Sequence, residues 1–403
     1  MSNIFDCGVI GCGVAGVFAC LKLSKEHKDM KIVAFDMGRP PQKRRRQIDG
    51  WFGCLPNSDG KVFTTDVAKV AELTGLRKAK SAFTYFNNIL SNIGTFKINK
   101  DKSPSISMEK KIAKAGYSLA TNDYMQMYPK DIHVLSKYMA DTIEKSKNIT
   151  FVFDNEVAKI YKNKGVFTIT TETQEYKCKK LIIAVGRSGW RWAKQLYSDF
   201  GIIDNNDIAK FGIRVETNSN IMKEFNKSNC TMVKDNIEIG PLSWYGTVIP
   251  EDHIDMAISA FRANENRWKS DKVSFTLIGQ QQFPNGGFEQ TDRIGKLTFL
   301  LANDRIIKER VSHIMTGKSK ISIIPEYDWL KNAINDFAAV LPEILTKSYF
   351  HVPTITPLAP KINIGTNLES DIDGMFVVGE SAGVRGILAA ATMGIIACDA
   401  ICK

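Results

Sequence analysis

The chain has 403 residues, which is enough for two domains with sizeable cores. Hydrophobic residues make up 44% and charged residues 24%, a balance that excludes a disordered or fibrous chain. The formal net charge is +11, and the eight cysteines include no C-x-x-C pair. We find no pattern of a membrane span or a secretory signal, so we expect a cytoplasmic protein with reduced thiols and no membrane partner.

The first predicted elements form a strand, a tight turn, a helix and a second strand. An apolar run at residues 7–10 leads into the spacing G-x-G-x-x-G, and a second apolar run at residues 32–35 ends at Asp36. This βαβ pattern is the fingerprint of dinucleotide binding. The glycines allow a tight turn, close approach of a pyrophosphate and close helix packing, and Asp36 is placed to accept hydrogen bonds from ribose hydroxyls.

A basic segment follows at residues 75–115. It contains nine bases and two acids, a local net charge of +7. Helical patterns are expected at residues 68–73 and 82–90, and a shorter basic cluster lies at residues 43–46. Two interpretations stay open: a solvated surface of lysines, or a site for an anionic substrate or a nucleic acid.

The next predicted elements are one helix and a series of short strands. Apolar positions within residues 131–144 fit one helical face. Strand-like runs then follow at residues 149–153, 156–162, 166–172, 175–178 and 179–186. We interpret them as a β-meander that crosses over to a buried parallel strand.

Residues 203–350 change to alternating strand-like runs with long polar connections, and we predict an inserted α+β substrate domain there. The chain returns at residues 351–403 with a buried strand at 375–378 and a helix of small residues that starts near Arg385 or Gly386. The predicted fold class is therefore α/β. A Rossmann-like FAD-binding domain with a β-meander crossover would comprise residues 1–202, including a basic helical insertion at about 66–130, together with the C-terminal return.

Two stretches favour FAD over NAD. Residues 181–190 form a buried strand that ends in a glycine, and Glu380 follows directly after Gly379 at the end of the C-terminal strand. In flavoproteins with two dinucleotide-binding domains, such an acid bonds the ribityl chain or pyrophosphate, and the next helix directs its N-terminus at the flavin pyrimidine. The sequence has no second G-x-G-x-x-G, so no separate NAD(P)H domain is expected.

Five blocks carry a resemblance to a known family: "GVIGCGVAG", "GWFGCLPNSDGKVF", "LIIAVGRSGW", "FGIRVE" and "FVVGESAGVRGILAAATMGIIACDAI". They resemble bacterial FAD-dependent dehydrogenases, or NAD(P)/FAD-dependent oxidoreductases, of the glutathione-reductase-like superfamily with two dinucleotide-binding domains. The resemblance implies FAD as the cofactor. It implies FAD contacts at Gly11, Gly13, Val14, Ala15, Gly16, Asp36, Met37, Ser58, Asp59, Gly60, Val157, Ala184, Gly186, Arg187, Gly379, Glu380, Gly386, Ile387 and Leu388.

Some of these implied contacts have specific roles. Val157 would offer its backbone to adenine, and Ser58 to Gly60 would lie beside the flavin, although the same letters also suit a simple turn. The family often has a cysteine in the inserted domain, whereas "GPLSWYGTVIPE" contains none, so a thiol-based step is not expected.

Three arginines are candidates for substrate contact: Arg214, Arg262 and Arg385. Arg214 and Glu216 alternate on a predicted strand and could point into one cleft, and Arg385 directly precedes the helix expected at the flavin. The five histidines show no metal-ligand spacing, so no metal site is predicted, and only His253 is a candidate acid or base.

The preferred hypothesis is an FAD-dependent oxidoreductase that transfers a hydride between flavin N5 and a small, unidentified substrate, for which an anion is one candidate. One alternative is a flavoprotein that modifies nucleic acid bases or nucleotides, similar in style to the tRNA uridine-modifying flavoproteins and motivated by the basic segment. A second alternative is a flavin-binding protein without turnover. The catalytic residues and the oligomeric state are not specified by the sequence.

Overall fold

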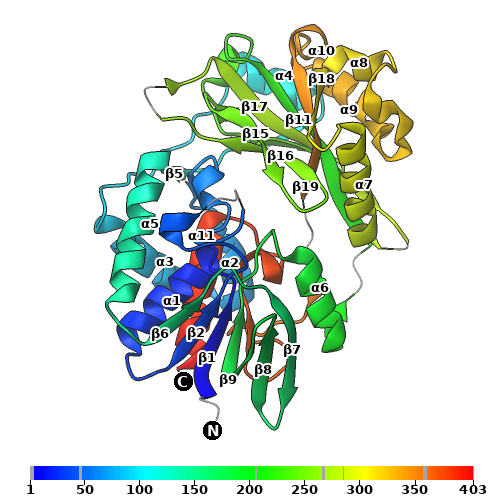
Figure 1. Cartoon of the computed structure of the whole chain (residues 1–403). Helices are drawn as coiled ribbons and strands as arrows, with labels where there is room; N and C mark the ends of the chain where they lie inside the picture. The colour runs from blue at the N-terminus through cyan, green and yellow to red at the C-terminus, as the bar shows by residue number, and fades with distance from the viewer. Residues whose placement is uncertain are drawn as a thin grey trace.

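The computed structural model describes residues 4–44, 48–204, 207–265, 268–284, 286–356 and 361–402. The chain forms two units, one above the other in Figure 1, each built around its own sheet. The lower unit contains both ends of the chain, and the upper unit is built mainly from its middle. Within the described ranges, no helix has the length and apolar character needed to cross a membrane.

The lower unit is built on a seven-stranded sheet in the order β6-β2-β1-β9-β8-β7, with β21 also paired to β9. Its strands are β1 (Ile4–Ile10), β2 (Ile32–Phe35), β6 (Ile149–Val152), β7 (Val157–Asn163), β8 (Val166–Thr171), β9 (Glu175–Ile183) and β21 (Met375–Val377). Strands β6, β2, β1, β9 and β21 run parallel, whereas β7, β8 and β9 pair in antiparallel fashion. The α/β class and the Rossmann-like sheet are confirmed.

Three of the predicted strand-like runs differ from the structure. Residues 149–153 were expected in the meander, but β6 pairs in parallel with β2 instead. The runs at 175–178 and 179–186 form the single strand β9, whose first half pairs with β8 and whose second half pairs with β21. Because strand partners distant in sequence are decided by tertiary packing, local pattern could not assign them.

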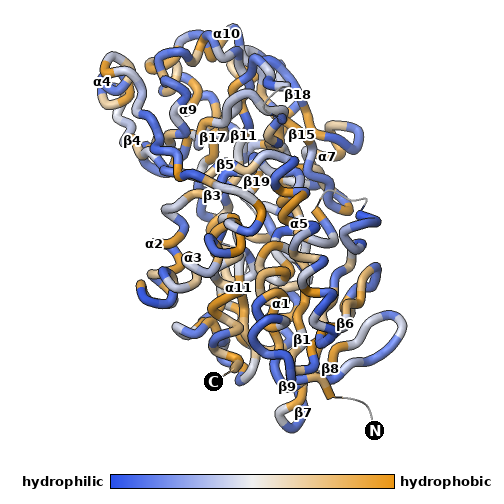
Figure 2. The backbone as a smooth tube through the Cα atoms, turned by 90° about the vertical axis from the view of Figure 1, so that its left-hand side faces the viewer, coloured by the Kyte–Doolittle hydropathy of each residue, from blue (hydrophilic) through white to orange (hydrophobic). Residues whose placement is uncertain are grey.

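Helices and strands cover the two faces of this sheet differently. The helices of the lower unit are α1 (Val14–Glu26), α2 (Asp66–Thr74), α3 (Leu76–Ser91), α5 (Pro129–Glu144), α6 (Trp190–Asp199) and α11 (Ile387–Ile401). Along β2, Ile32 and Ala34 pack with α1, α3, α5 and α11, whereas Val33 and Phe35 pack with the meander and α6. Figure 2 shows the hydrophobic residues concentrated along β1, α1 and α11 inside this unit.

Helices α1 and α11 lie in close contact at the centre of the lower unit. A Cβ atom on Gly394 would lie 2.2 Å from the Ala15 carbonyl oxygen, and the Cys398 thiol donates to the Ala19 carbonyl oxygen at 3.4 Å. Gly394 therefore allows the backbone of α11 to approach that of α1.

The upper unit contains an eight-stranded antiparallel sheet in the order β18-β19-β11-β17-β13-β12-β4, with β14 paired to β17. Its strands are β4 (Ser118–Ala120), β11 (Ile208–Asn218), β12 (Thr231–Lys234), β13 (Ile237–Ile239), β14 (Ser243–Trp244), β17 (Lys272–Gln282), β18 (Ile307–Arg310) and β19 (Tyr349–Thr356). A separate hairpin consists of β15 (Thr247–Asp252) and β16 (Ala257–Arg262). The helices are α4 (Ile106–Lys114), α7 (Gly287–Leu301), α8 (Val311–Met315), α9 (Trp329–Ala338) and α10 (Ile344–Lys347).

The chain passes between the units more often than the predicted boundaries suggest. Helix α4 and strand β4 lie within the segment assigned to the FAD-binding domain, yet β4 pairs with β12, and Met108 and Ile112 join the upper core. The strand β19 also continues the upper sheet past residue 350. The short strands β10 (Ile203–Asp204) and β20 (Lys361–Ile362) pair with each other where the chain leaves the lower unit and returns to it.

Candidate functional site

The carboxyl ends of the parallel strands bring the predicted cofactor residues together. Strands β1, β2, β9 and β21 end at residues 10, 35, 183 and 377, and the loops that follow share one edge of the sheet. In open α/β sheets, ligands bind at this edge.

The three glycines of the first turn differ in what a side chain at each position would contact. A Cβ on Gly11, whose φ is +97°, would lie 2.5 Å from the Ala184 carbonyl oxygen, and one on Gly16 would lie 1.8 Å from the Gly11 carbonyl oxygen. Among the described residues apart from its chain neighbours, the atom nearest to a Cβ on Gly13 would be the Ala184 carbonyl oxygen, at 3.9 Å. Packing therefore explains Gly11 and Gly16 but leaves space in front of Gly13.

That space suits a phosphate group. The first hydrogen bond within α1 runs from the Val17 amide to the Gly13 carbonyl oxygen, so the preceding amides, including those of Val14 and Ala15, have no partner within the helix. Free amides and the positive end of the helix dipole favour an anion at this place. The residues present thus fit the pyrophosphate of FAD.

A cavity of about 570 Å³ is lined by Arg39, Gln42, Lys43 and Arg44, in the loop after β2. The Arg44 guanidinium donates to the carbonyl oxygens of Trp51 and Gly53. A Cβ on Gly53 would lie 3.3 Å from the Gly13 Cα, so this loop borders the glycine turn. Sequence reasoning noted the bases at 43–46 but did not assign them to the cofactor. Arg45 and Arg46 lie outside the described residues.

Asp36 binds backbone amides in the structure. Its carboxylate accepts hydrogen bonds from Cys12 at 2.7 Å and from Gly38 and Gly50 at 2.8 Å each. Burial raises the pKa of this carboxyl, whereas the three amides lower it. Asp36 therefore joins three loops at the sheet edge. The predicted ribose contact stays a prediction.

Other predicted cofactor residues lie around the same edge. Met37 is half-buried directly after Asp36, and Ala184 packs under the first turn. The Gly186 amide donates to the Ser381 hydroxyl at 3.3 Å, which joins the ends of β9 and β21. The Val157 carbonyl oxygen accepts a hydrogen bond from the Trp192 indole at 2.6 Å, so this backbone group already has a partner.

The predicted stretch from Ser58 to Gly60 forms a tight turn. The Gly60 amide donates to the Ser58 hydroxyl at 3.1 Å, and Gly60 has a φ of +65°. A Cβ at this glycine would lie 1.8 Å from the Met127 carbonyl oxygen. The turn begins strand β3 (Lys61–Phe63), which pairs with β5 (Tyr124–Gln126). It also touches the upper unit, because the Ala263 amide donates to the Ser58 carbonyl oxygen.

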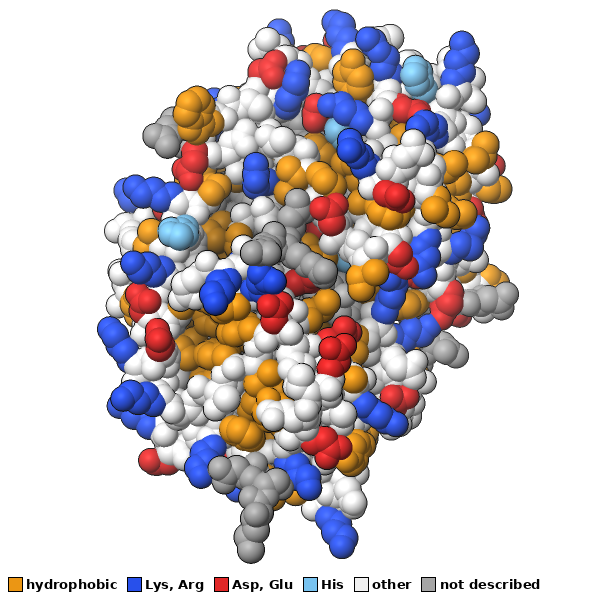
Figure 3. Space-filling view, in the orientation of Figure 1, with side chains coloured by type: hydrophobic (Ala, Val, Ile, Leu, Met, Phe, Trp, Pro, Cys, Tyr) orange, Lys and Arg blue, Asp and Glu red, His pale blue; other side chains and the backbone are white. Residues whose placement is uncertain are grey.

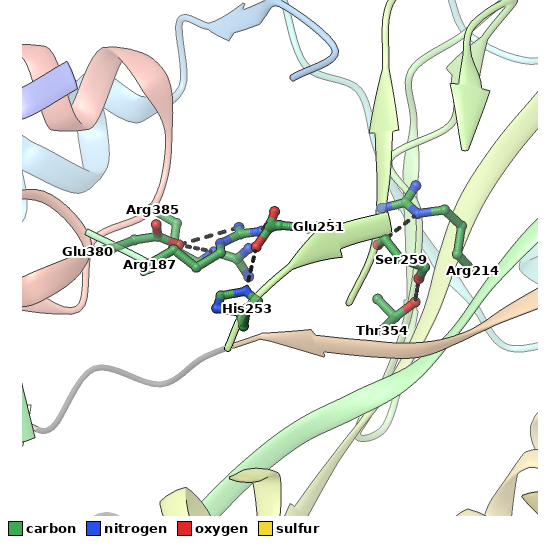
Figure 4. Close-up of polar contacts among 8 residues, drawn as sticks. All are labelled: Arg187, Arg214, Glu251, His253, Ser259, Thr354, Glu380 and Arg385. Carbon is green, nitrogen blue, oxygen red and sulfur yellow. Dashed lines mark hydrogen bonds and ion pairs between the residues drawn. The ribbon is translucent and has the colours of Figure 1, made fainter. Parts of the chain in front are cut away.

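A group of four ion-paired side chains connects the two units (Figure 4). Arg187, after β9, contacts Glu251 of β15 at 2.8 Å and Glu380 at 3.4 Å. Arg385 contacts the same oxygen of Glu380 at 3.0 Å. Glu380 is thus paired with two arginines in the structure, and its predicted contact with the ribityl chain or pyrophosphate stays a prediction.

Glu251 is the most deeply buried carboxylate of this group, at 5% exposed. Burial favours its neutral form, but Arg187 and the hydrogen bond with His253 outweigh burial and lower the pKa of Glu251 to about 2. His253 lies 3.1 Å from the second oxygen of Glu251. Over the described ranges, His, Cys, Asp and Glu side chains form no group that could hold a metal ion.

The start of helix α11 faces a buried acid that sequence reasoning did not identify. The Asp66 carboxylate, in the first turn of α2, accepts a hydrogen bond from the Lys69 ammonium at 2.9 Å, and its other oxygen would contact a Cβ on Gly386 at 2.0 Å. Burial raises the pKa of Asp66. The predicted contacts at Gly386, Ile387 and Leu388 lie here, so a negative side chain already meets the positive end of this helix.

The three candidate substrate arginines are in different surroundings. Arg385 belongs to the ion-paired group, and Arg262 is exposed at the end of β16. Arg214 projects from β11 toward β16 and β17, where its guanidinium donates to the Ser259 carbonyl oxygen and the Ser274 hydroxyl, both at 3.3 Å. Glu216 instead pairs with His351 at 3.3 Å. In Figure 3, an apolar area lies near the middle of the face, with basic and acidic side chains beside it.

Comparisons with known proteins give one family and several distant structures. The model of the family "Glucose inhibited division protein A" matches residues 6–239. A comparison with curated protein sequences gave no match.

The structural matches include a glycine oxidase from Geobacillus kaustophilus, with 13% identity, a TM-score of 0.45, and coverage of 99% of this chain and 95% of that one. The halogenase PltM, solved with phloroglucinol and FAD, has 13% identity and a TM-score of 0.49 over 99% and 68% of the two chains. The p-nitrophenol 4-monooxygenase PnpA from Pseudomonas putida DLL-E4 has 10% identity and a TM-score of 0.43 over 98% and 77%.

Proposed function

The chain belongs to the glucose-inhibited division protein A family, and we propose that it transfers a hydride between the N5 atom of FAD and a small substrate held by the upper unit. It is a flavoprotein and an FAD-dependent oxidoreductase.

The observation that carries the proposal is the open space at Gly13. A glycine that no protein atom requires, next to free amides at the start of α1, is explained by a ligand that approaches the backbone. The cavity lined by Arg39, Gln42, Lys43 and Arg44 adds positive charge beside this turn. FAD has a pyrophosphate to occupy such a place.

The chain's own side chains would position the reacting partners. The pairs of Arg187 with Glu251 and Glu380 connect the upper unit to the edge of the lower sheet. This connection holds the loops that carry Glu380 and Arg385 in a fixed relation to β15. A substrate bound between the units would therefore meet a prearranged site, which reduces the entropic cost of orientation.

The experiment that tests the proposal is the visible spectrum of the purified protein. We expect bound FAD, released as FAD and not FMN on denaturation, and bleaching of its absorption when a hydride donor is added without oxygen. NADH, NADPH and small carboxylic acids with an α-hydroxyl or α-amino group are the donors to compare. Bound FAD that none of these donors reduces would contradict hydride transfer, and a colourless protein that takes up no FAD would contradict the cofactor itself.

A further inference from the structure

We propose that Lys61 and Arg214 together bind the carboxylate group of the substrate, so that the substrate is a small monocarboxylate. This inference rests on the proposed function, because it places the substrate beside the flavin-binding loops. The two cations come from different units, Lys61 from β3 below and Arg214 from β11 above.

Lys61 is a buried cation held by neutral groups. Its side chain is 7% exposed, and its ammonium donates to the Leu242 carbonyl oxygen at 3.0 Å and the Ser243 hydroxyl at 3.4 Å. Burial lowers the pKa of Lys61. An ammonium has three donors, so one remains for a further acceptor.

Arg214 is likewise a cation whose hydrogen-bond partners are neutral groups. Its Nε atom donates to the Ser259 carbonyl oxygen and its Nη1 atom to the Ser274 hydroxyl, and Figure 4 shows the guanidinium beside Ser259, whose hydroxyl contacts Thr354. Burial lowers the pKa of Arg214 to about 10. The Nη2 end makes no hydrogen bond within the described part of the chain, so part of the planar fork is free for an oxyanion.

Lys61 and Arg214 differ from the neighbouring Arg187 and Arg385 because they have no carboxylate partner. Arg187 and Arg385 each contact a carboxylate, whereas no described carboxylate lies within ion-pair distance of Lys61 or Arg214. A buried charge without a partner is costly, and an incoming anion would remove that cost. The two cations are therefore prepared for a ligand of opposite charge.

Lys61 and Arg214 lie close enough for their charges to interact. Ser243 and Ser274, which accept from Lys61 and Arg214, are opposite each other in the pairing of β14 with β17. The positive charge of Arg214 is one of the causes that lower the pKa of Lys61. One ligand can thus reach both cations.

The local charge favours a monoanion. Among carboxylates, Asp59 has the largest effect on the pKa of both Lys61 and Arg214, although it lies beyond ion-pair distance. The other charged groups that act on this pair cancel, because Asp101 and Glu251 are negative and Arg187 and Arg385 are positive. Lys61, Arg214 and Asp59 therefore leave a net charge of +1. A carboxylate matches this charge and the planar fork of arginine, whereas a phosphate dianion would exceed it.

The test is a titration of the FAD-loaded protein with benzoate, followed by flavin absorption and by calorimetry. We expect a saturable response to benzoate, a smaller one to inorganic phosphate and none to neutral benzamide. R214M and K61M should each raise the benzoate Kd at least about tenfold, which corresponds to 1.4 kcal/mol. R214K, which keeps the charge but loses the fork, should have an intermediate effect.

The matched control is R77M, which removes one exposed positive charge from α3. Benzoate binding by R214M and K61M as tight as by R77M would overturn the proposal, as would phosphate binding tighter than benzoate or no benzoate binding by the wild type. Calorimetry does not need the flavin signal. A protein without FAD would therefore contradict the proposed function, whereas a yellow protein indifferent to benzoate would contradict this inference alone.

Discussion

Gly13 separates what the protein needs for folding from what it needs for its cofactor. Gly11 and Gly16 are both required by neighbouring backbone, whereas the side-chain position of Gly13 is open. The same G-x-G-x-x-G letters thus serve two purposes, and only the structure tells them apart. Substitutions at these positions should accordingly have different consequences.

We expect G13V to lose FAD while keeping its fold. Its side chain would occupy the space in front of the first amides of α1, so the FAD Kd should rise by at least about tenfold. Stability should fall by no more than about 1 kcal/mol, the cost of a poorer N-cap. Flavin fluorescence titration measures the affinity, and urea unfolding of the apoprotein measures the stability.

G16A is the contrasting variant, because its Cβ would lie 1.8 Å from the Gly11 carbonyl oxygen. It should destabilise the apoprotein by about 1–3 kcal/mol through overpacking. If both variants lost stability equally and G13V still bound FAD, the distinction between the two glycines would be wrong.

Glu251 should make stability depend on pH in the acid range. Burial opposes ionisation, but Arg187 and His253 hold the pKa of Glu251 at about 2. An unfolded glutamate titrates near about 4.3, so the stabilisation is fully present above that pH and is lost as pH falls toward 2. The size of the shift corresponds to a contribution on the order of 3 kcal/mol.

We therefore expect the difference in unfolding free energy between wild type and E251Q to shrink as pH falls from 5 toward 2. Denaturant unfolding at a series of pH values measures it. E144Q, which changes an exposed glutamate at the end of α5, is the control and should differ little from the wild type at any pH. A constant difference between wild type and E251Q would show that Glu251 does not titrate in this way.

Among the elements, the contact of α1 with α11 decides the geometry of the cofactor site. Helix α11 can approach because Gly394 has no side chain, and the first turn of α1 lies against the same contact through Ala15. The position of the α1 N-terminus thus depends on a helix that begins at Ile387, 373 residues after Val14 in the chain. Packing far from the ligand should influence its binding.

G394A should destabilise the protein by about 1–3 kcal/mol, because its Cβ would lie 2.2 Å from the Ala15 carbonyl oxygen. The displaced first turn of α1 should also weaken FAD binding. Thermal unfolding and FAD titration measure the two effects. G94A is the matched control, since its Cβ would come only within 3.6 Å of the Phe96 ring. Unchanged stability of G394A would contradict the close contact.

Elements with a strong local pattern could be predicted from the sequence. Strand β2 was expected at residues 32–35 and has those bounds, and the helix expected at 131–144 is α5, Pro129–Glu144. Strand β2 is a continuous apolar run buried on both faces, and in α5 the spacing of apolar residues matches the buried side of the helix. The glycine spacing likewise identified the turn at the sheet edge.

Partners distant in the sequence could not be predicted. The pairing of β6 with β2 and of β4 with β12 depends on the packing of whole units, which leaves no local signal. The same holds for the site: Arg187 and Glu380 were expected near FAD, but the pairing of Arg187 with Glu251, 64 positions further along the chain, leaves no local signal. Lys61 belonged to a recognised block, yet its burial without an acid became visible only in the structure.

Across the whole molecule, the basic segment at residues 75–115 is divided between the units. Helix α3 belongs to the lower unit and α4 to the upper core. Lys100 pairs with Asp123 at 2.5 Å, and Phe83, Tyr85 and Phe86 pack against the lower core and are not free to stack on bases. Figure 3 shows positive and negative side chains interspersed on one face. These observations favour a solvated surface.

We therefore expect wild type and the variant K97Q/K100Q/K102Q to bind DNA and RNA equally weakly. A polyanion site would make binding fall with salt, by a slope of about 0.7 to 0.9 for each neutralised phosphate, and the variant would reduce that slope. Electrophoretic shifts at low and moderate salt distinguish the two. A steep slope that the variant loses would instead support the nucleic-acid alternative.

The last strand and helix of the chain also constrain how the protein is made. Strand β21 and helix α11 complete the lower sheet and cover α1, but they lie within residues 375–401 and therefore leave the ribosome long after α1. At about 5–20 residues per second, the apolar face of α1 waits on the order of half a minute for its partner. In the nascent chain that face of α1 therefore stays uncovered until α11 has emerged, and the lower unit can enclose FAD only after that point.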